Sequence, residues 1–285
     1  MDTIAVADYE SFFGDPVLGM DNIVEILAAW KGQSIPASDF LRRILSYDGW
    51  VVLLNGNDTT ETFGRFSLST AELVRDAQGT TRLWVYSSSD VFEQHQPKMA
   101  AAPHVQYIFD ALGHEIFGEK LEGMDAVVID PGSPHECTID QAQFSEVREL
   151  AQAVAIEEVW ERLRVGHPDE PDDISRAAQY AGYYLAGIQS EEGVVQISVP
   201  HDDGRSFIPI FTHADALALA VAEFRRDFAP AEIKTVRVNG EQAFPALAQE
   251  KADGIVFNFK GPGEPIAFAL GVIQIVLEEL AREKE

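Results

Sequence analysis

The sequence predicts an α+β fold made of two tandem copies of one helix–strand–strand–helix–strand–helix unit, each with a small mixed sheet packed by helices. A chain of 285 residues is long for one domain and comfortable for two. Three sequence blocks also recur in the same order in each half, which indicates an internal repeat. The blocks are Asp48–Leu54, Arg82–Phe92 and Met124–Pro131 in the first half, and Glu192–Val199, Phe207–Leu217 and Ala252–Phe259 in the second.

Each element of the unit has its own local signal. The opening helices have N-cap candidates and apolar residues at helical spacing. The second strands are rich in aromatic and β-branched residues, and a Gly/Pro turn follows the third. The closing helix of the second copy has one wide apolar face. The predicted helices are Ser38–Tyr47 and Asp173–Ala186 at the start, and Gln141–Arg164 and Pro265–Glu283 at the end.

The copies are not identical. The first contains an insertion, Asn55–Thr81, in which we expect a strand at Thr62–Leu68 and a short helix near Ala71–Arg75. Between the copies lies Gly166–Asp173, whose prolines and acids are typical of a linker. We therefore place the domains at residues 1–165 and 166–285.

The strand assignments also predict a core, because helices on both faces of a sheet bury its side chains on both sides. In the third block, Asp125–Asp130 (DAVVID) aligns with Asp253–Asn258 (DGIVFN) without a gap. We expect these residues to be buried: Val51, Leu53, Val85, Val127, Ile129, Val195, Ile197, Ile208, Ile210, Ile255 and Phe257.

Charge is the most unusual property of the chain. Forty-seven acids against 21 bases give a net charge of -26, divided as -16 over residues 1–165 and -10 over residues 166–285. A field of this sign repels nucleic acid and anionic membranes and attracts basic partners. The alternative is that the acidity only maintains solubility.

The rest of the composition indicates a soluble, cytoplasmic protein. One cysteine, Cys137, excludes an internal disulfide and fits a reducing compartment. The N-terminal residues lack the pattern of a secretory signal. The longest apolar stretch, Ile266–Leu277, is too short to span a bilayer, and we expect a buried helix there.

Two short motifs resemble those of a known bacterial family. Phe207–Leu217 (FIPIFTHADAL) is similar to the strand that ends in a Pro-x-Phe-Thr-Ser-like turn in the SseB N-terminal-type domain of the enhanced serine sensitivity protein. Val127–Ser133 (VVIDPGS) resembles the family's second motif, a strand ending in an Asn-Pro-Gly-like turn. The resemblance covers most of residues 45–160 and 190–283. It implies an accessory or immunity role, and it carries no catalytic residues over.

The sequence contains no recognised catalytic, nucleotide-binding or cofactor-binding motif. Gly261-Pro262-Gly263 follows a strand, but its glycines suit the turn. His135-Glu136-Cys137 groups three metal-ligand types in one loop, yet adjacent residues seldom converge on one ion, so we expect an exposed polar loop and no metal. His201-Asp202-Asp203 has the composition of a solvated turn. Pairing of Cys137 with His114 or His135 as a nucleophile is the remaining enzymatic option.

Two functions remain open. The first is a non-catalytic protein whose acidic surface binds a basic protein, with toxin neutralisation as one form of that role. The candidate contact residues are the acids of the connections, Asp169, Glu170, Asp202 and Asp203. The second is a small-molecule sensor or an enzyme with a site between the two copies. The sequence favours neither a particular partner nor an oligomeric state.

Overall fold

The structure is a computed structural model that describes residues 22–55, 71, 73–75, 77–95, 105–118, 121, 123–165, 173–191, 193–201, 203–261 and 265–282. Contacts divide these residues into two compact units, which meet between Ala155 and Ile156. This division lies inside one long helix, ten residues before the boundary that the linker composition suggests. Each unit is described by itself.

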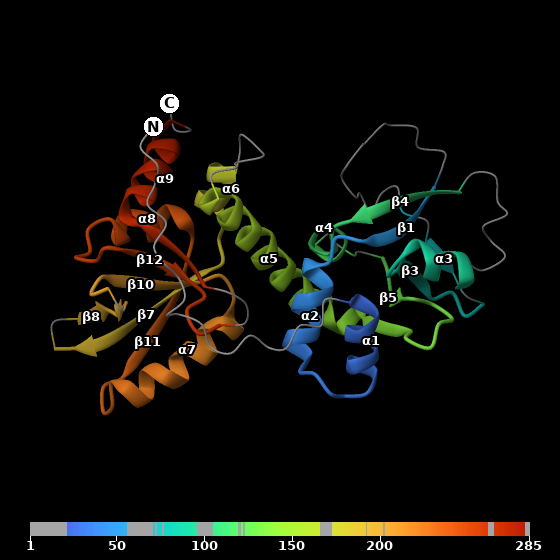
Figure 1. Ribbon diagram of the computed structural model, residues 1–285, viewed down its shortest axis with the longest axis horizontal. Coiled ribbons are helices and arrows are strands. Elements are labelled where there is room, and N and C mark those ends of the chain that lie inside the picture. The colour runs from blue at the N-terminus through green and yellow to red at the C-terminus, as the bar shows by residue number, and fades with distance from the viewer. Residues whose placement is uncertain are drawn as a thin grey trace. The chain divides into compact units, whose positions relative to one another are not determined.

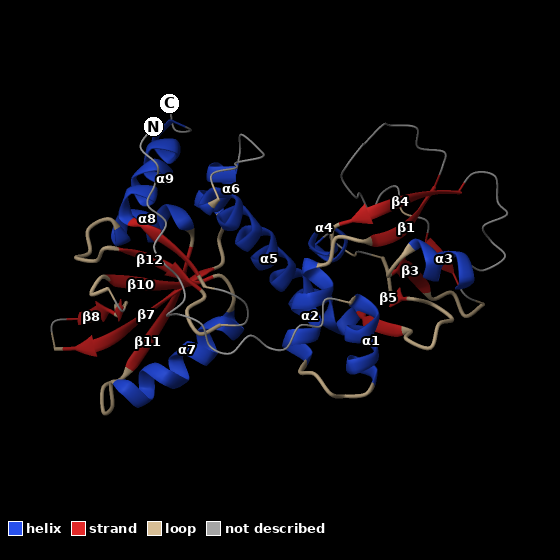
Figure 2. Ribbon diagram, in the orientation of Figure 1, coloured by secondary structure: helices blue, strands red, loops and turns tan. Residues whose placement is uncertain are grey.

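The first unit holds one mixed sheet and its helices (Figures 1 and 2). The strand order is β4-β1-β3-β5-β6, and β2 pairs with β3. Strands β3 and β5 are parallel, and every other pairing given for this sheet is antiparallel. The helices are α1 (Ile23–Lys31), α2 (Ala37–Ser46), α3 (Ser89–His95), α4 (Gly113–Gly118) and the first half of α5 (Phe144–Arg164), which follows a short 3-10 turn at Gln141–Gln143; the strands are β1 (Trp50–Asn55), β2 (Leu73–Arg75), β3 (Thr81–Tyr86), β4 (Val105–Ala111), β5 (Ala126–Ile129) and β6 (Cys137–Asp140).

The second unit repeats this plan. Its strand order is β11-β7-β10-β12-β13, with β8 paired to β7 and β9 to β10, and its parallel pair is β10 with β12. The helices are the second half of α5, α6 (Asp173–Gln179), α7 (Ala214–Asp227), α8 (Gly240–Leu247) and α9 (Leu270–Arg282); the strands are β7 (Tyr183–Ser190), β8 (Gly193–Gln196), β9 (Val199–Pro200), β10 (Ser206–Phe211), β11 (Ile233–Val238), β12 (Gly254–Phe257) and β13 (Ile266–Ala269).

The helices cover equivalent faces of the two sheets. In the second unit, Trp160 of α5, Phe244 of α8 and Ile273 of α9 pack on one face, while α7 covers the other with Leu217 and Phe224. In the first unit α1, α2, α4 and α5 pack on one face, and Phe92 of α3 lies in a separate cluster with Tyr86. Helix α5 contributes to both cores, because Val147–Val154 belong to the first and Ile156–Trp160 to the second. The chain thus ends one unit and starts the next within a single helix.

The predicted duplication is confirmed for the third sequence block, whose two copies align without a gap. Strands β5 and β12 occupy the same place in their sheets, each parallel to the preceding long strand and antiparallel to the next short one. Matched hydrogen bonds also join the starts of the parallel strands. The carboxylate of Asp125 accepts from Thr81 N–H at 2.7 Å, and that of Asp253 accepts from Ser206 N–H at 2.8 Å.

The predicted first strand of the second copy was wrong. Residues predicted as the end of a helix, up to Ala186, form strand β7, and the predicted strand Glu192–Val199 supplies only the short β8 and the start of β9. The equivalent of β1 is therefore β7. Each strand follows a Tyr-x-Gly-aromatic turn, Tyr47–Trp50 and Tyr180–Tyr183, in which a Cβ on the glycine would lie 2.3 or 2.5 Å from the tyrosine Oη.

Other predicted elements also differ from the structure. Ile266–Ala269 is strand β13 rather than the first turn of the closing helix, and Leu73–Arg75 is strand β2 rather than a helix. Strands β4, β6 and β11 had not been predicted. The predicted strand Thr62–Leu68 lies outside the described residues.

The predicted core is confirmed except at one position. Ten of the eleven listed residues are buried, with exposures from 0% to 6%. Val195 is 57% exposed and lies in β8, a short strand whose four residues are all exposed or half-buried.

Candidate functional site

The carboxyl ends of parallel strands are the usual place for binding residues in sheets with helices on both faces. In the second unit, β10 ends next to Thr212 and β12 ends next to Asn258, and both side chains are buried. Asn258 has a φ of 52°, a left-handed conformation that asparagine tolerates better than most residues. This backbone turn directs its side chain back toward β10.

Asn258 joins the two strand ends. Its Oδ1 accepts a hydrogen bond from Thr212 N–H at 3.0 Å, and its Nδ2 donates one to the Thr212 hydroxyl oxygen at 3.0 Å. A buried backbone N–H that lacked a partner at this point would cost about 1–3 kcal/mol. The Thr212–Asn258 pair therefore fixes the ends of both parallel strands.

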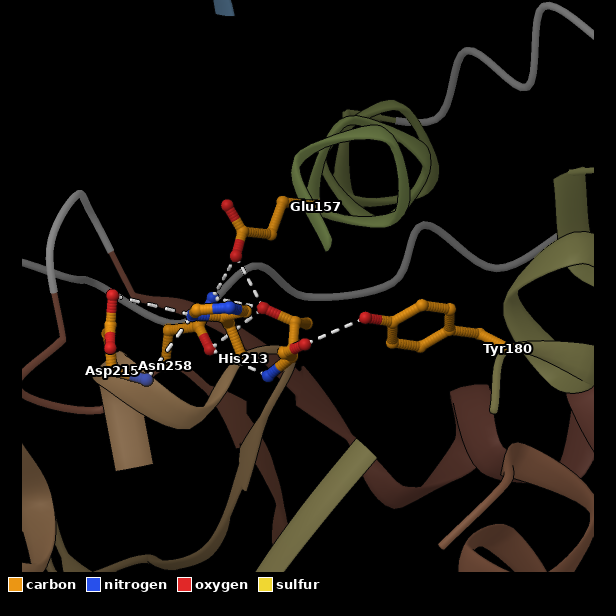
Figure 3. A network of polar contacts seen from close by, with 6 residues as sticks. Glu157, Tyr180, His213, Asp215 and Asn258 are labelled. Carbon is orange, nitrogen blue, oxygen red and sulfur yellow. Dashed lines mark hydrogen bonds and ion pairs between the residues drawn. The ribbon is translucent and has the colours of Figure 1, made fainter. Parts of the chain in front are cut away.

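Glu157 on α5 adds a carboxylate to this pair (Figure 3). Its Oε1 accepts a hydrogen bond from Asn258 Nδ2 at 2.7 Å and another from the Thr212 hydroxyl. The contact connects residues 101 positions apart in the sequence. It anchors the second half of α5 to the strand ends of its own unit.

Two further groups complete the network in Figure 3. The Tyr180 hydroxyl donates to the carbonyl of Thr212 at 2.8 Å. His213 is the N-cap of α7, and its Nδ1 accepts from Asp215 N–H at 3.3 Å while lying 3.6 Å from the Asp215 carboxylate. Residues 212–215 are thus held by both side-chain and helix-cap contacts.

The first unit has a matching pair, Ser87–Asp130. Asp130 has a φ of 50°, and its carboxylate accepts from Ser87 N–H at 2.6 Å and from the Ser87 hydroxyl at 2.7 Å. The Tyr47 hydroxyl donates to the Ser87 carbonyl at 2.7 Å, as Tyr180 does to Thr212. The two copies therefore preserve one strand-end geometry with different polar side chains.

The electrostatics of the first pair are set by burial. Burial raises the pKa of Asp130, against the hydrogen bonds from Ser87 and the positive fields of His135 and His95, which lower it. Burial and the Asp130 charge also raise the pKa of Tyr86, whose buried hydroxyl has no hydrogen-bond partner among the described residues.

The thiol of Cys137 is affected in the same way. Burial and the negative charges of Asp130 and Glu136 raise its pKa to about 12.

These contacts assign the strand-end side chains a positioning role. In both pairs the side-chain oxygen of the second residue accepts the backbone N–H of the first. Their polar atoms hold one another and the backbone, and a thiol with a pKa near 12 stays protonated at neutral pH.

Cys137 was predicted in an exposed polar loop, and this was wrong. It lies in β6 and is buried. Glu136, in the same tripeptide, accepts a hydrogen bond from Gly132 N–H at 2.6 Å. Within the described part of the chain, no three His, Cys, Asp or Glu side chains come together in a way that could hold a metal ion.

Of the four acids predicted to contact a partner, the structure describes one. Asp169, Glu170 and Asp202 lie outside the described residues. Asp203 lies in the turn before β10, and its carboxylate binds Arg205 Nε at 2.7 Å and lies 2.9 Å from His201 Nδ1. Hydrogen bonds from the Arg205 side chain and backbone lower the pKa of Asp203, so this acid is ionised and already paired.

Sequence reasoning did not single out Glu157, Tyr180 or Tyr47 as site residues. A signal existed for the strand-end pairs, because Asp130 and Asn258 align in the third block and Ser87 and Thr212 follow equivalent strands. The repeated Tyr-x-Gly turn was a second signal. Nothing in the local sequence around Glu157 marks its distant partners.

Fold and site together define a duplicated α+β protein with one strand-end geometry in each copy. The SseB protein N-terminal domain matches the chain twice, at residues 23–146 and 147–268. The chain belongs to the SseB family. The first match ends and the second begins within the first turn of α5, the helix that contributes to the cores of both units.

Solved structures add only distant likenesses. A chain titled "Anabaena Tic22 (protein transport)" is 11% identical, with 76% of this chain and 88% of that chain covered and a TM-score of 0.19. Tic22 from Plasmodium falciparum is 9% identical, with coverages of 69% and 82% and a TM-score of 0.15. No curated protein matches the sequence. Among the helices that the structure describes, none has the length and apolar character needed to cross a membrane.

Proposed function

We propose that this protein is a non-catalytic accessory protein of the SseB family that binds a basic protein partner through its acidic surface. The observation that carries the proposal is the net charge of -26, present in both halves of the chain. A field of this size raises the association rate of an oppositely charged protein and repels nucleic acid. Neutralisation of a basic toxin, in a reducing cytoplasmic compartment, is the specific form of this role that we propose.

The chemistry of the strand-end pairs supports a role without catalysis. Thr212, Asn258, Ser87 and Asp130 are buried, and their side chains hold strand ends. A general acid or base needs a group that can reach a substrate proton. The side chains that align best between the copies are used for structure, which leaves the surface charge as the feature available to a partner.

The acids of the connections remain the proposed contact residues. Asp203 is already neutralised by Arg205, so a partner gains less from it. Exposed ion pairs contribute little to stability, so reversing these charges should leave folding nearly unchanged. Asp203 is therefore left unchanged in the test, which alters Asp169, Glu170 and Asp202.

The test is capture of partners from the source organism, followed by binding kinetics. The variant Asp169→Lys, Glu170→Lys, Asp202→Lys is compared with Asp169→Glu, Glu170→Asp, Asp202→Glu, which keeps the charge. We expect the association rate of the captured protein to fall about tenfold with the lysine variant and with added salt. A rate that responds to neither change would refute the electrostatic role and leave the acidity as an aid to solubility.

A further inference from the structure

Strand β11 is an open sheet edge with unusual exposure. It pairs with β7 on one side over its whole length, from Ile233 opposite Ile188 to Val238 opposite Tyr183. No strand in the described part of the chain pairs with its other side. Its four central residues, Lys234 to Arg237, are all exposed, although neighbouring side chains point to opposite faces. Both faces of the edge are therefore accessible within the described structure.

The backbone pattern shows which groups this edge offers. Gln189 N–H donates to the carbonyl of Glu232 at 2.9 Å, so residue 232 faces β7 with its hydrogen-bonding groups. In an antiparallel pair the inward-facing residues alternate. The backbone groups of residues 234, 236 and 238 then point toward β7, and those of Ile233, Thr235 and Arg237 point outward. This leaves three N–H donors and three carbonyl acceptors on the open side.

The local charge of this edge is opposite to that of the protein. Strand β11 itself, Ile233–Val238, carries two bases and no acid in a chain of net -26. Lys234 pairs with Glu232 at 2.6 Å, and Arg237 lies over the Tyr184 ring at 5.6 Å. Because screening limits exposed charges to about 8–10 Å at physiological salt, a segment on β11 experiences mainly these nearby bases.

We propose that β11 binds an extended acidic segment of a partner polypeptide as an added strand. Backbone hydrogen bonds to Ile233, Thr235 and Arg237 provide the pairing, as in other cases of strand addition to an open edge. Arg237, together with Lys234 when it exchanges its exposed pairing with Glu232 for the incoming strand, selects glutamate or aspartate side chains on opposite faces of that strand. A second copy of this chain is a poorer occupant, because two molecules of net -26 repel each other.

The probe is a fluorescent decapeptide of alternating threonine and glutamate, with its ends blocked. Two matched peptides are a threonine–lysine version and a threonine–glutamate version with N-methyl groups on alternate residues. The overall charge of the protein favours the lysine peptide, whereas the proposal requires the glutamate peptide to bind at least tenfold more tightly. N-methylation removes backbone pairing and keeps the charge, and should weaken binding at least tenfold.

A pair of variants locates the interaction on β11. Thr235→Pro removes an outward N–H that no described strand uses, and should weaken the glutamate peptide at least tenfold, whereas Thr235→Val keeps the N–H and should bind as the parent does. Amide exchange of Ile233, Thr235 and Arg237 in the parent should slow on binding. If Thr235→Pro fails to fold, the N-methylated peptide and the exchange data decide.

Three results would overturn the proposal: no binding of the glutamate peptide, equal or tighter binding of the lysine peptide, or equal binding after N-methylation. The first two would indicate that Lys234 serves only to discourage edge-to-edge association. The residues tested here are different from the acids of the proposed function, so either proposal can fail while the other stands.

Discussion

The carboxylate of Asp130 accepts hydrogen bonds from both the backbone N–H and the hydroxyl of Ser87, at 2.6 and 2.7 Å, in a buried position where its counterpart in the second copy is an asparagine. An amide makes the equivalent contacts with Thr212. The same geometry is thus built once with a charge and once without. We therefore expect ionisation at this position to make the stability of the first unit depend on pH, whereas the asparagine at the equivalent position of the second unit does not ionise.

Replacing Asp130 with asparagine should stabilise the first unit at neutral pH by about 1 kcal/mol. Burial raises the pKa of Asp130 above its value near 3.9 in the unfolded chain, so the folded state holds the proton more tightly. Its contribution to the free energy of unfolding is therefore largest below that unfolded pKa and declines as pH rises through the folded pKa. Asparagine also suits a φ of 50°.

Urea unfolding of Asp130→Asn and the parent from pH 4 to 8, read by hydrogen exchange in β3 and β5, measures this difference. The stabilisation should shrink as pH falls, because the parent carboxyl is then protonated and neutral. Exchange in β10 and β12 is the internal control and should not change. A variant that is less stable than the parent at pH 7 would contradict the assignment.

Two glycines mark the same close approach in each copy. A Cβ on Gly113 would lie 2.1 Å from the Ile44 carbonyl oxygen, and one on Gly240 would lie 2.1 Å from that of Ala178. Backbone cannot yield as a flexible side chain can, so Gly113→Ala and Gly240→Ala should each destabilise their own unit by about 2 kcal/mol or more.

The matched control for these two substitutions is Gly271→Ala in α9. A Cβ there meets nothing within 4 Å, so alanine should be neutral or stabilising by up to about 1 kcal/mol. Thermal unfolding of the three variants measures the contrast. Equal effects at Gly113 and Gly271 would show that the close approach is not what selects glycine.

The elements predicted correctly from sequence are those whose local pattern agrees with their environment. Strands β3 and β10 are rich in aromatic and β-branched residues and lie in buried sheet centres. Strand β11 was not predicted, because its residues are exposed on both faces and the strand has no buried side to give a regular apolar–polar alternation. Ile266–Ala269 continues the apolar run of α9 without a break, so periodicity could not separate the strand from the helix.

The site was only partly predictable for a related reason. The alignment of Asp130 with Asn258 indicated an equivalent position, because both follow a short apolar strand. Glu157 joins that position through the fold, across 101 residues, and no local pattern encodes such a contact. The Tyr180–Gly182 turn was predicted as part of a helix because apolar residues at helical spacing continue through it from the N-cap candidate Asp173.

The reciprocal substitution at the second strand end, Asn258→Asp, should be strongly destabilising. Asn258 Nδ2 donates to Glu157 Oε1 at 2.7 Å, and aspartate would replace this donor with a second carboxylate. A buried carboxylate and the half-buried one of Glu157, this close together, cannot both ionise without a large cost, and the lost hydrogen bond adds to it. We expect a loss of about 2–4 kcal/mol at pH 7, since breaking a buried charged network costs this much.

The double variant Asn258→Asp, Glu157→Gln should recover much of this loss, because glutamine Nε2 can donate to the new carboxylate. A double-mutant cycle on the free energy of unfolding gives the coupling, which we expect to exceed 1 kcal/mol in favour of the pair. The single variant should also approach the parent as pH falls toward 4, when one carboxyl takes up a proton and can donate again. Additive effects of the two substitutions, with no dependence on pH, would mean that Glu157 does not depend on Asn258 as its donor, and that other contacts of α5, such as the packing of its Val159 and Trp160 in the core, hold the helix in place.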